Sequence, residues 1–181
     1  MNKLALGHWG VRMFFVLSGF LITGILIKCR DSIDQSRKDQ WLIIKNFYIR
    51  RCLRLMPIYY LTILVTSILF FSEVKPLLIW HLTYTSNFYF FWHQWEPYTS
   101  HFWALAVEQQ FYLVWPFLIL LTPRKYIAKL ISITILIGPL FRLLMVILGY
   151  SNGDREYLLI FACLDSLGLG SLLSLLDGSL F

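Results

Sequence analysis

The sequence predicts an all-α fold, a polytopic bundle of transmembrane helices. Of the 181 residues, 58% are hydrophobic and only 14% are charged, whereas soluble domains carry roughly 45–50% and about 25%. A soluble domain of this size could not bury so much apolar surface, and a disordered chain would be far less hydrophobic. Aromatic residues make up 18% of the chain, which indicates packed helices with aromatic belts at the membrane interfaces.

Five apolar stretches are long enough to cross a bilayer as helices. A spanning helix needs about 20 mainly apolar residues. A further apolar stretch, residues 77–92, is short and carries polar residues such as His81 and Asn87 near its middle. We therefore expect this stretch to be either a short re-entrant segment or a sixth span. The five expected spans are residues 9–27, 55–71, 102–121, 126–148 and 157–176.

Basic residues predict how the bundle is oriented. Residues 28–54 contain eight basic and three acidic residues, and segments rich in Lys and Arg stay on the cytoplasmic side. We therefore expect residues 28–54 to form a cytoplasmic basic loop. A second basic segment, residues 122–129, lies on the same side if residues 77–92 are re-entrant, and the charge rule favours this arrangement. The formal charge of +6 is thus assigned to membrane orientation, and no nucleic-acid partner is expected.

The cysteines indicate neither a disulfide framework nor a metal site. The chain has three of them, Cys29, Cys52 and Cys163, and no CxxC pair. An odd number without such a pair matches neither pattern. We therefore expect no metal ion.

Three ionisable residues stand out inside the expected spans: Glu108, Arg142 and Asp165. A charge at the centre of a spanning helix costs at least ~2.5–3.5 kcal/mol on insertion scales, so each needs a partner or a function. At 1.5 Å per residue, each lies about 9–12 Å from the end of its span, all on one side of the membrane. We therefore predict that Arg142 pairs with one or both acids. The alternative for these residues is a buried ion pair that only fixes the helix register.

Glu108, Tyr112 and Trp115 follow one another at the i, i+4, i+7 spacing of a single helix face. A carboxylate, a phenol and an indole on one intramembrane face suggest the wall of a wet pocket. The alternative for the two aromatic residues is anchoring at the lipid interface.

Small residues and arginines mark the first two spans. Ser18 and Gly19 predict close helix packing, because neither a nearby base nor a nucleophile elbow is visible for Ser18. Arg51 and Arg54 share a helix face at the cytoplasmic mouth, where their planar forks suit phosphate oxygens. The alternative for the arginines is simple anchoring at the membrane surface.

Taken together, four segments resemble the acyltransferase type-three family of integral membrane acyltransferases, in the order and spacing of that family. They are Gly10-Val11 with Phe14-Phe15-Val16-Leu17-Ser18-Gly19-Phe20; Arg50-Arg51-x-x-Arg54-x-x-Pro57-x-Tyr59-Tyr60; His101-x-Trp103-x-Leu105-x-Val107-Glu108-x-Gln110-Phe111-Tyr112-x-x-Trp115-Pro116; and Asp165-x-x-x-x-Gly170. The resemblance implies transfer of an acyl group, often acetyl, from acyl-CoA to a cell-surface carbohydrate. It implies no bound cofactor and a multi-pass location in a bacterial plasma membrane.

The same resemblance assigns roles to individual residues. Arg51 and Arg54 match the arginine motif that engages the donor, and Glu108 matches the family's conserved acid. The Phe-Phe-x-x-Ser-Gly motif is matched by Phe14, Phe15, Ser18 and Gly19. Two positions depart from the family: Ala104 stands where Ser is usual, and Gln109 where Glu is usual.

The family also begins with a further span that carries an Arg and a catalytic His. We therefore interpret residues 1–181 as one partial domain of a truncated member, and we expect no acyl transfer by this chain alone. His101, near Glu108, is the only substitute base that the sequence offers. The alternatives to the acyltransferase are a non-catalytic membrane remnant and a small-molecule transporter, since charged groups and a re-entrant segment also mark substrate pathways.

Overall fold

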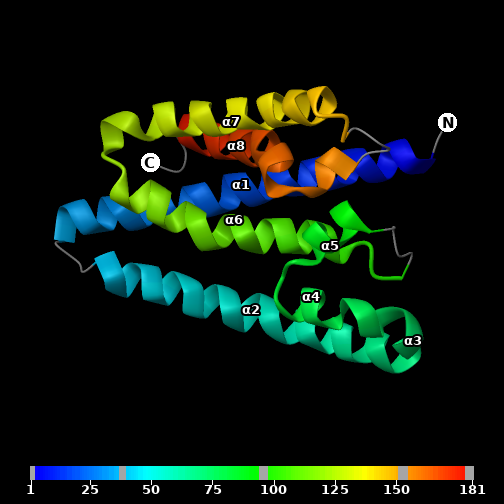
Figure 1. Ribbon diagram of the computed structural model, residues 1–181. Coiled ribbons are helices and arrows are strands. Elements are labelled where there is room, and N and C mark those ends of the chain that lie inside the picture. Colours follow the sequence, from blue (N-terminus) through cyan, green and yellow to red (C-terminus); the bar gives the residue numbers. More distant parts are fainter. Residues whose placement is uncertain (1–2, 37–39, 94–97, 151–154, 178–181) are drawn as a thin grey trace.

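The computed structural model describes residues 3–36, 40–93, 98–150 and 155–177, and within them it confirms the all-α prediction. Five helices form the body of the bundle and run along one another in alternating directions (Figure 1). They are α1 (Lys3–Ser36), α2 (Gln40–Leu69), α6 (Phe102–Leu121), α7 (Arg124–Ile147) and α8 (Ile160–Leu176).

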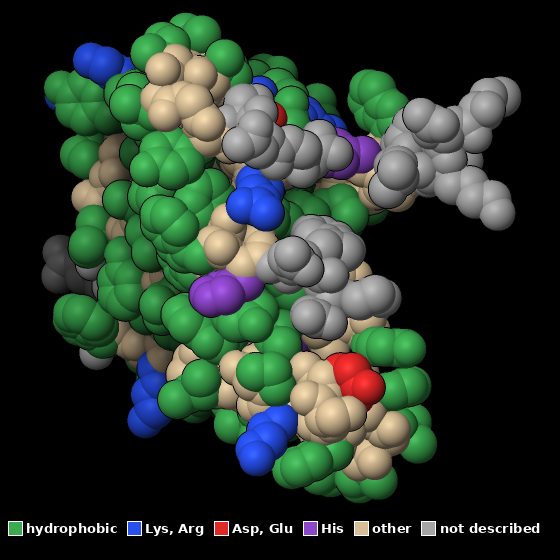
Figure 2. Space-filling view, turned by 45° about the vertical axis from the view of Figure 1, so that its right-hand side comes forward, with side chains coloured by type: hydrophobic (Ala, Val, Ile, Leu, Met, Phe, Trp, Pro, Cys, Tyr) green, Lys and Arg blue, Asp and Glu red, His purple; other side chains and the backbone are tan. Residues whose placement is uncertain are grey.

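Four of these helices contain a segment long and apolar enough to cross a membrane. The segments are Gly7–Asp31, Trp41–Leu69, Phe102–Leu121 and Arg124–Ile147, and α8 is a shorter apolar helix of 17 residues. Each of the five expected spans therefore corresponds to one helix. The surface in Figure 2 is covered mainly by hydrophobic side chains, as expected where lipid tails are the solvent. The chain is a multi-pass membrane protein.

The expectation of a loop at residues 28–54 is wrong, because helix continues into it from both sides. α1 extends to Ser36 and α2 begins at Gln40. The apolar side chains of Ile44 and Phe47 are buried against the bundle, so this part of α2 is fixed by packing despite its charges. In α1, Arg30 donates hydrogen bonds to the carbonyl oxygens of Ile119 and Thr122 at the C-terminal end of α6, where a helix lacks its own donors.

Residues 77–92 do not cross the bundle, so the sixth-span alternative is wrong. They begin at the end of η1 (Lys75–Leu77), which follows α3 (Phe71–Val74), and form two short helices, α4 (Leu78–Leu82) and α5 (Ser86–Trp92). At the turn between α4 and α5, Tyr84 adopts a positive φ of 54°. Each helix is far shorter than the thickness of a bilayer. α2 ends and α6 begins at the same end of the bundle (Figure 1).

Buried hydrogen bonds hold the turn between α4 and α5 against α6. The side-chain amide of Gln110 donates to the carbonyl oxygen of Tyr84 and to Asn87 Oδ1, both at 2.9 Å. The Asn87 amide donates to Gln110 Oε1 at 3.3 Å in return. The polar residues that made the segment ambiguous in the sequence are therefore its attachment to the bundle.

The two basic segments lie at one end of the bundle, as the charge rule predicts. Arg124, which begins α7, is 2.7 Å from Asp31 of α1. Residues 122–129 thus share an end with the C-terminal part of α1. This is the arrangement expected when residues 77–92 do not cross.

Glycines let α1 and α8 approach backbone to backbone. A Cβ atom on Gly19 would lie 2.0 Å from the carbonyl oxygen of Leu167, and one on Gly170 would lie 1.9 Å from that of Val16. No side chain fits at either position. The close packing predicted from Ser18 and Gly19 is confirmed, and it brings Ser18 to the centre of the bundle.

Candidate functional site

Glu108 of α6 is the buried carboxylate of the bundle centre, with 7% of its side chain exposed. Two hydroxyl groups donate hydrogen bonds to its Oε1 atom: Ser18 from α1 and Tyr112 from α6. Tyr112 reaches Glu108 because residues four apart lie one above the other on a helix. Ser18 reaches it from the neighbouring helix α1, where the adjacent Gly19 packs against α8. The carboxylate is thus solvated by two protein hydroxyls.

Arg51 of α2 completes this group of residues. Its Nη2 atom lies 3.9 Å from Glu108 Oε1, and its guanidinium carbon lies 3.7 Å from the centre of the Tyr112 ring. The first distance is an ion pair without a hydrogen bond, and the second is a close cation–π contact. Its Nε atom is buried and has no hydrogen-bond partner among the described residues. Arg51 therefore has donors to offer to a ligand.

Donor binding by the two arginines stays a prediction, and the structure places their side chains in different surroundings. Arg51 does not lie at the cytoplasmic mouth but inside the bundle, because α2 already begins at Gln40. Arg54, one helical turn further along, is exposed. The two guanidinium groups therefore do not act on the same neighbour.

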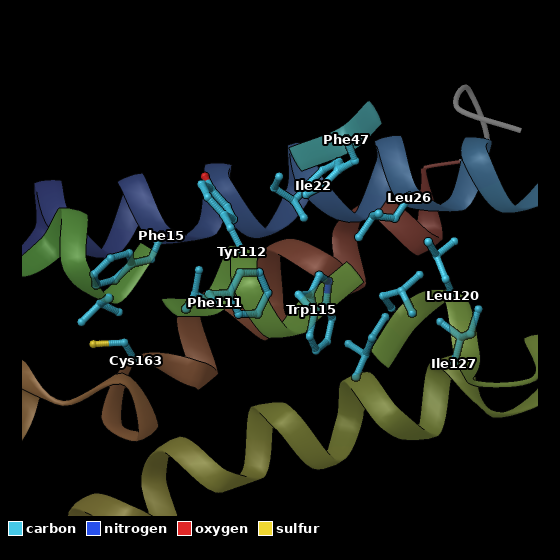
Figure 3. Close-up of a cluster of buried hydrophobic side chains, with 14 of the residues drawn as sticks. Phe15, Ile22, Leu26, Phe47, Phe111, Tyr112, Trp115, Leu120, Ile127 and Cys163 are labelled. Atoms are coloured by element: carbon cyan, nitrogen blue, oxygen red, sulfur yellow. The ribbon is translucent and has the colours of Figure 1, made fainter. Parts of the chain in front are cut away.

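The aromatic residues of α6 are core residues, as Figure 3 shows for Tyr112 and Trp115. Both are 2% exposed, which excludes anchoring at the lipid interface. Trp115 Nε1 donates to Thr23 Oγ1 at 2.8 Å, and Thr23 Oγ1 donates to Ser171 Oγ at 2.8 Å. Trp115 thus belongs to a hydrogen-bond network that links α6, α1 and α8, and a pocket wall at Glu108 and Tyr112 stays a prediction.

The two phenylalanines of the Phe-Phe-x-x-Ser-Gly motif point in different directions. Phe15 is 1% exposed and packs edge-on against the ring of Trp103, at a centroid distance of 5.9 Å. Phe14 is 36% exposed. The motif therefore has an inward face, with Phe15 and Ser18, and a more exposed side.

The predicted pairing of Arg142 with an acid is confirmed for Asp165. Arg142 Nη2 lies 2.7 Å from Asp165 Oδ2, and Arg142 Nη1 donates to the carbonyl oxygen of Ala162. The other possibility, a pair between Arg142 and Glu108, is not formed. Sequence reasoning missed Arg12, whose Nη1 atom lies 3.8 Å from Asp165 Oδ2. Its position in an apolar stretch was the signal that could have identified it.

His101 does not reach Glu108. It is an exposed residue immediately before α6, and its ring lies against Phe102 at a centroid distance of 4.4 Å. Seven residues of helix separate it from Glu108, about 10 Å along the axis. Ser18, Tyr112 and Arg51, rather than a histidine, surround the carboxylate within the described residues. The structure gives no support to His101 as a substitute base.

A different histidine is buried: His81 of α4 is 0% exposed. Neither of its ring nitrogens has a hydrogen-bond partner among the described residues. Burial, with a smaller contribution from His101, lowers the pKa of His81 to about 4. The sequence showed only a histidine in an ambiguous apolar stretch. Across the described part of the chain, no three His, Cys, Asp or Glu side chains come together to hold a metal ion.

Comparison with known proteins gives one family. Residues 1–174 match the family described as an acyltransferase domain. The chain is 38% identical over 165 residues to the peptidoglycan O-acetyltransferase OatA of Listeria monocytogenes, covering 82% of this chain and 26% of that protein. No solved structure matches.

Two further relatives show the same pattern. The putative peptidoglycan O-acetyltransferase YrhL of Bacillus subtilis is 34% identical, over 82% of this chain and 25% of that protein. The O-acetyltransferase OatA of Staphylococcus aureus is 31% identical, over 83% of this chain and 26% of that protein. The chain therefore spans about a quarter of the length of these relatives.

Proposed function

The chain belongs to the acyltransferase domain family, and from that premise we propose that it is part of a membrane enzyme that transfers an acetyl group to a hydroxyl of a cell-wall glycan. Three relatives are named as O-acetyltransferases, and two of these names specify peptidoglycan. No observation favours the transporter or the non-catalytic remnant.

The observation that carries the proposal is the carboxylate of Glu108, held in the bundle by Ser18 and Tyr112 and faced by Arg51. In acyl transfer from a thioester to an alcohol, a C–O bond forms, the C–S bond breaks and the hydroxyl proton leaves. The departing thiolate takes up a proton in turn. A positioned carboxylate can accept the hydroxyl proton. Both hydrogen bonds from described residues end on Oε1, so we place the acceptor hydroxyl at Oε2.

Arg51 supports the donor side of the proposal. We take the donor to be an acyl-CoA, whose phosphates are the anionic groups that a guanidinium fork binds in pairs of hydrogen bonds. Arg51 has an unpartnered Nε and a side chain that is 18% exposed. Its contact with the Tyr112 ring holds the fork beside Glu108. In this proposal the donor-binding residue and the proton acceptor are therefore neighbours.

Donor binding provides the first test. Labelled acetyl-CoA is titrated onto the purified chain in nanodiscs, and Arg51→Lys is compared with the wild type. Lysine keeps the charge but loses the fork, so we expect the affinity to fall about tenfold, the effect of one lost charge-assisted hydrogen bond. Arg50→Lys is the matched control, because Arg50 is the exposed neighbour on the same helix, and it should change affinity by less than about twofold. Equal affinity in Arg51→Lys and the wild type contradicts the donor role.

Proton transfer provides the second test. Acetyl esters on peptidoglycan are measured in membranes that contain the chain and its cellular partners. Glu108→Gln preserves the shape and one acceptor oxygen but removes the base, so transfer should fall by about 10²-fold or more. Transfer at the wild-type rate in Glu108→Gln would exclude Glu108 as the proton acceptor.

A further inference from the structure

Arg12 and Arg142 share a single carboxylate, that of Asp165. Both ion pairs that the described residues form here end on Asp165 Oδ2, at 2.7 Å from Arg142 and at 3.8 Å from Arg12. Asp165 Oδ1 accepts instead from the backbone N–H of Ser166, at 2.7 Å. Among the described residues, two guanidinium charges therefore face one carboxylate, an excess of one positive charge.

The two arginines differ in how far their donors are used. Arg142 donates to Asp165 and to the carbonyl oxygen of Ala162, and 19% of its side chain is exposed. Arg12 forms no comparable hydrogen bond with a described residue. It makes the 3.8 Å ion pair with Asp165 and lies against the Tyr157 ring, whose centre is 5.3 Å from the guanidinium carbon. With 34% of its side chain exposed, Arg12 is the more accessible of the two arginines.

Aromatic groups hold the fork of Arg12 in place. The Tyr157 ring lies 5.3 Å from the guanidinium carbon of Arg12 and 5.6 Å from that of Arg142. The ring of His8, one helical turn before Arg12, contacts Tyr157 edge-on at 5.0 Å. A guanidinium that rests on a ring is pre-organised, so less side-chain entropy is lost when it binds a ligand.

The cluster lies at a consistent depth. Arg12 is five residues inside the apolar segment Gly7–Asp31, Arg142 is five residues before the end of α7 and Asp165 is five residues after the start of α8. At 1.5 Å per residue, Arg142 and Asp165 are ~7.5 Å from their helix ends and Arg12 is ~7.5 Å from the start of its apolar segment, and all three lie towards the same side of the bundle (Figure 1). The interfacial layer on each side of a bilayer is about 5–8 Å thick. The cluster therefore lies near the level of lipid phosphates.

We infer that Arg12, supported by Arg142 and Tyr157, binds a phosphate group at the membrane interface, at the end of the bundle opposite the basic segments. An unbalanced charge in a spanning segment is costly, and a bound dianion or monoanion removes that cost. Arginine forks match phosphate oxygens in pairs. The phosphate belongs either to a lipid headgroup or to a soluble molecule. This inference does not depend on the proposed acyl transfer.

The test uses the purified chain in micelles of a neutral detergent. Native mass spectrometry measures the affinity for the first molecule of each probe that binds. The probes are dioleoyl phosphatidic acid, dioleoylglycerol, which has the same tails without the phosphate, and inorganic phosphate. The wild type should bind phosphatidic acid at least about tenfold more tightly than dioleoylglycerol, as expected for charge-assisted hydrogen bonds. In Arg12→Gln this preference should be lost, and in Arg12→Lys it should be partly kept.

Two variants with the same loss of charge serve as controls. Lys75→Gln lies at the same end of the bundle, and Lys129→Gln lies at the other end, where the basic segments gather; both residues are exposed. Each should keep the preference to within about twofold. The inference is overturned if Arg12→Gln binds like the wild type, if it loses no more than Lys129→Gln does, or if dioleoylglycerol binds as well as phosphatidic acid. Arg12-dependent binding of inorganic phosphate identifies a soluble ligand, and its absence beside Arg12-dependent lipid binding identifies a headgroup.

Discussion

Glu108 and Asp165 are both carboxylates in the interior of the bundle, with 7% and 14% of their side chains exposed, and they are held in different ways. Asp165 has a tight ion pair at 2.7 Å and a backbone N–H donor. Glu108 has two hydroxyl donors and a guanidinium at 3.9 Å. One carboxylate is neutralised by contact with a cation, and the other is mainly solvated by neutral groups.

The difference separates a structural charge from a reactive one. A tight pair with a buried guanidinium holds a carboxylate ionised and engaged, and removing one partner leaves the other charge without compensation. Hydroxyl donors stabilise a carboxylate but can also rotate or be displaced when a substrate hydroxyl arrives. Asp165 therefore fixes α7 against α8, while Glu108 is available for chemistry. Mutations at the two sites should accordingly affect different measurements.

The largest loss of stability should follow from breaking the tight pair. Asp165→Asn leaves Arg142 largely buried between α7 and α8 without its close carboxylate, and we expect a loss of about 3–5 kcal/mol in the free energy of unfolding. Unfolding in mixed micelles with increasing denaturing detergent measures it. The exposed pair of Arg124 with Asp31 is the control, because Asp31→Asn should cost less than about 1 kcal/mol. A loss in Asp165→Asn no larger than in this control would show that Asp165 is not a structural charge.

His81 extends the comparison to a buried ionisable group without a partner. Burial lowers its pKa to about 4, below the unfolded value of about 6.5. At pH values between these two, the unfolded segment binds more protons than the folded one, so stability rises with pH in that window. The α4–α5 segment should therefore loosen as the pH falls from 6.5 towards 4, by less than the loss in Asp165→Asn.

Amide hydrogen exchange of residues 78–92 measures this loosening. In His81→Phe the dependence on pH should be much weaker, since no proton can bind there. An equal dependence in the variant and the wild type would place the sensitive group elsewhere.

A glycine in α7 tests how closely the structural carboxylate is enclosed. A Cβ on Gly138 would lie 2.8 Å from Asp165 Cβ and 2.9 Å from its backbone nitrogen, so Gly138→Ala must push α7 away from α8. We expect a cost of about 2 kcal/mol, typical of overpacking. Gly10→Ala is the control, because nothing lies within 4 Å of a Cβ there and alanine is the better helix former. The unfolding midpoints of the two variants should shift in opposite directions, and a shift in the same direction would argue against close packing at Gly138.

Much of this arrangement follows from single residues in the sequence. The apolar stretches predict the helices, and the cost of a charge in a span predicts the pair of Arg142 with Asp165. The small residues Ser18 and Gly19 predict the close approach of α1 to a neighbouring helix. The charges of residues 122–129 correctly favour an arrangement in which residues 77–92 do not cross. Each of these depends on local composition or on a strong energetic penalty.

The position of Arg51 inside the bundle could not be predicted from the sequence. Its neighbours in the sequence are charged, and a rule that counts charges assigns them to a loop. The burial of Ile44 and Phe47 against other helices keeps α2 regular at that point, and such tertiary packing leaves no periodic signal in so polar a stretch. The prediction that Trp115 lines a pocket could not be corrected from the sequence for a related reason. Helix spacing places Trp115 on the face of Glu108, but its hydrogen-bond partner Thr23 lies on another helix.

The smallest effect on stability should come from the hydroxyl groups around Glu108. Tyr112→Phe keeps the ring on which Arg51 rests and removes one of the two donors to Oε1, so we expect a loss of about 1.5 kcal/mol, the lower limit for a hydrogen bond to a charged group. Phe161→Tyr, on the exposed face of α8, is a control for the hydroxyl itself.

Ser18→Ala removes the other donor, and the double variant should cost more than the sum of the single ones, because the carboxylate then keeps only the distant guanidinium. Unfolding in detergent gives these energies. Acetyl transfer, measured in membranes that contain the chain and its cellular partners, should fall by a larger factor than stability alone explains. If the two substitutions were additive and transfer were unchanged, the hydroxyls would be ordinary packing groups, and the distinction between Glu108 and Asp165 would disappear.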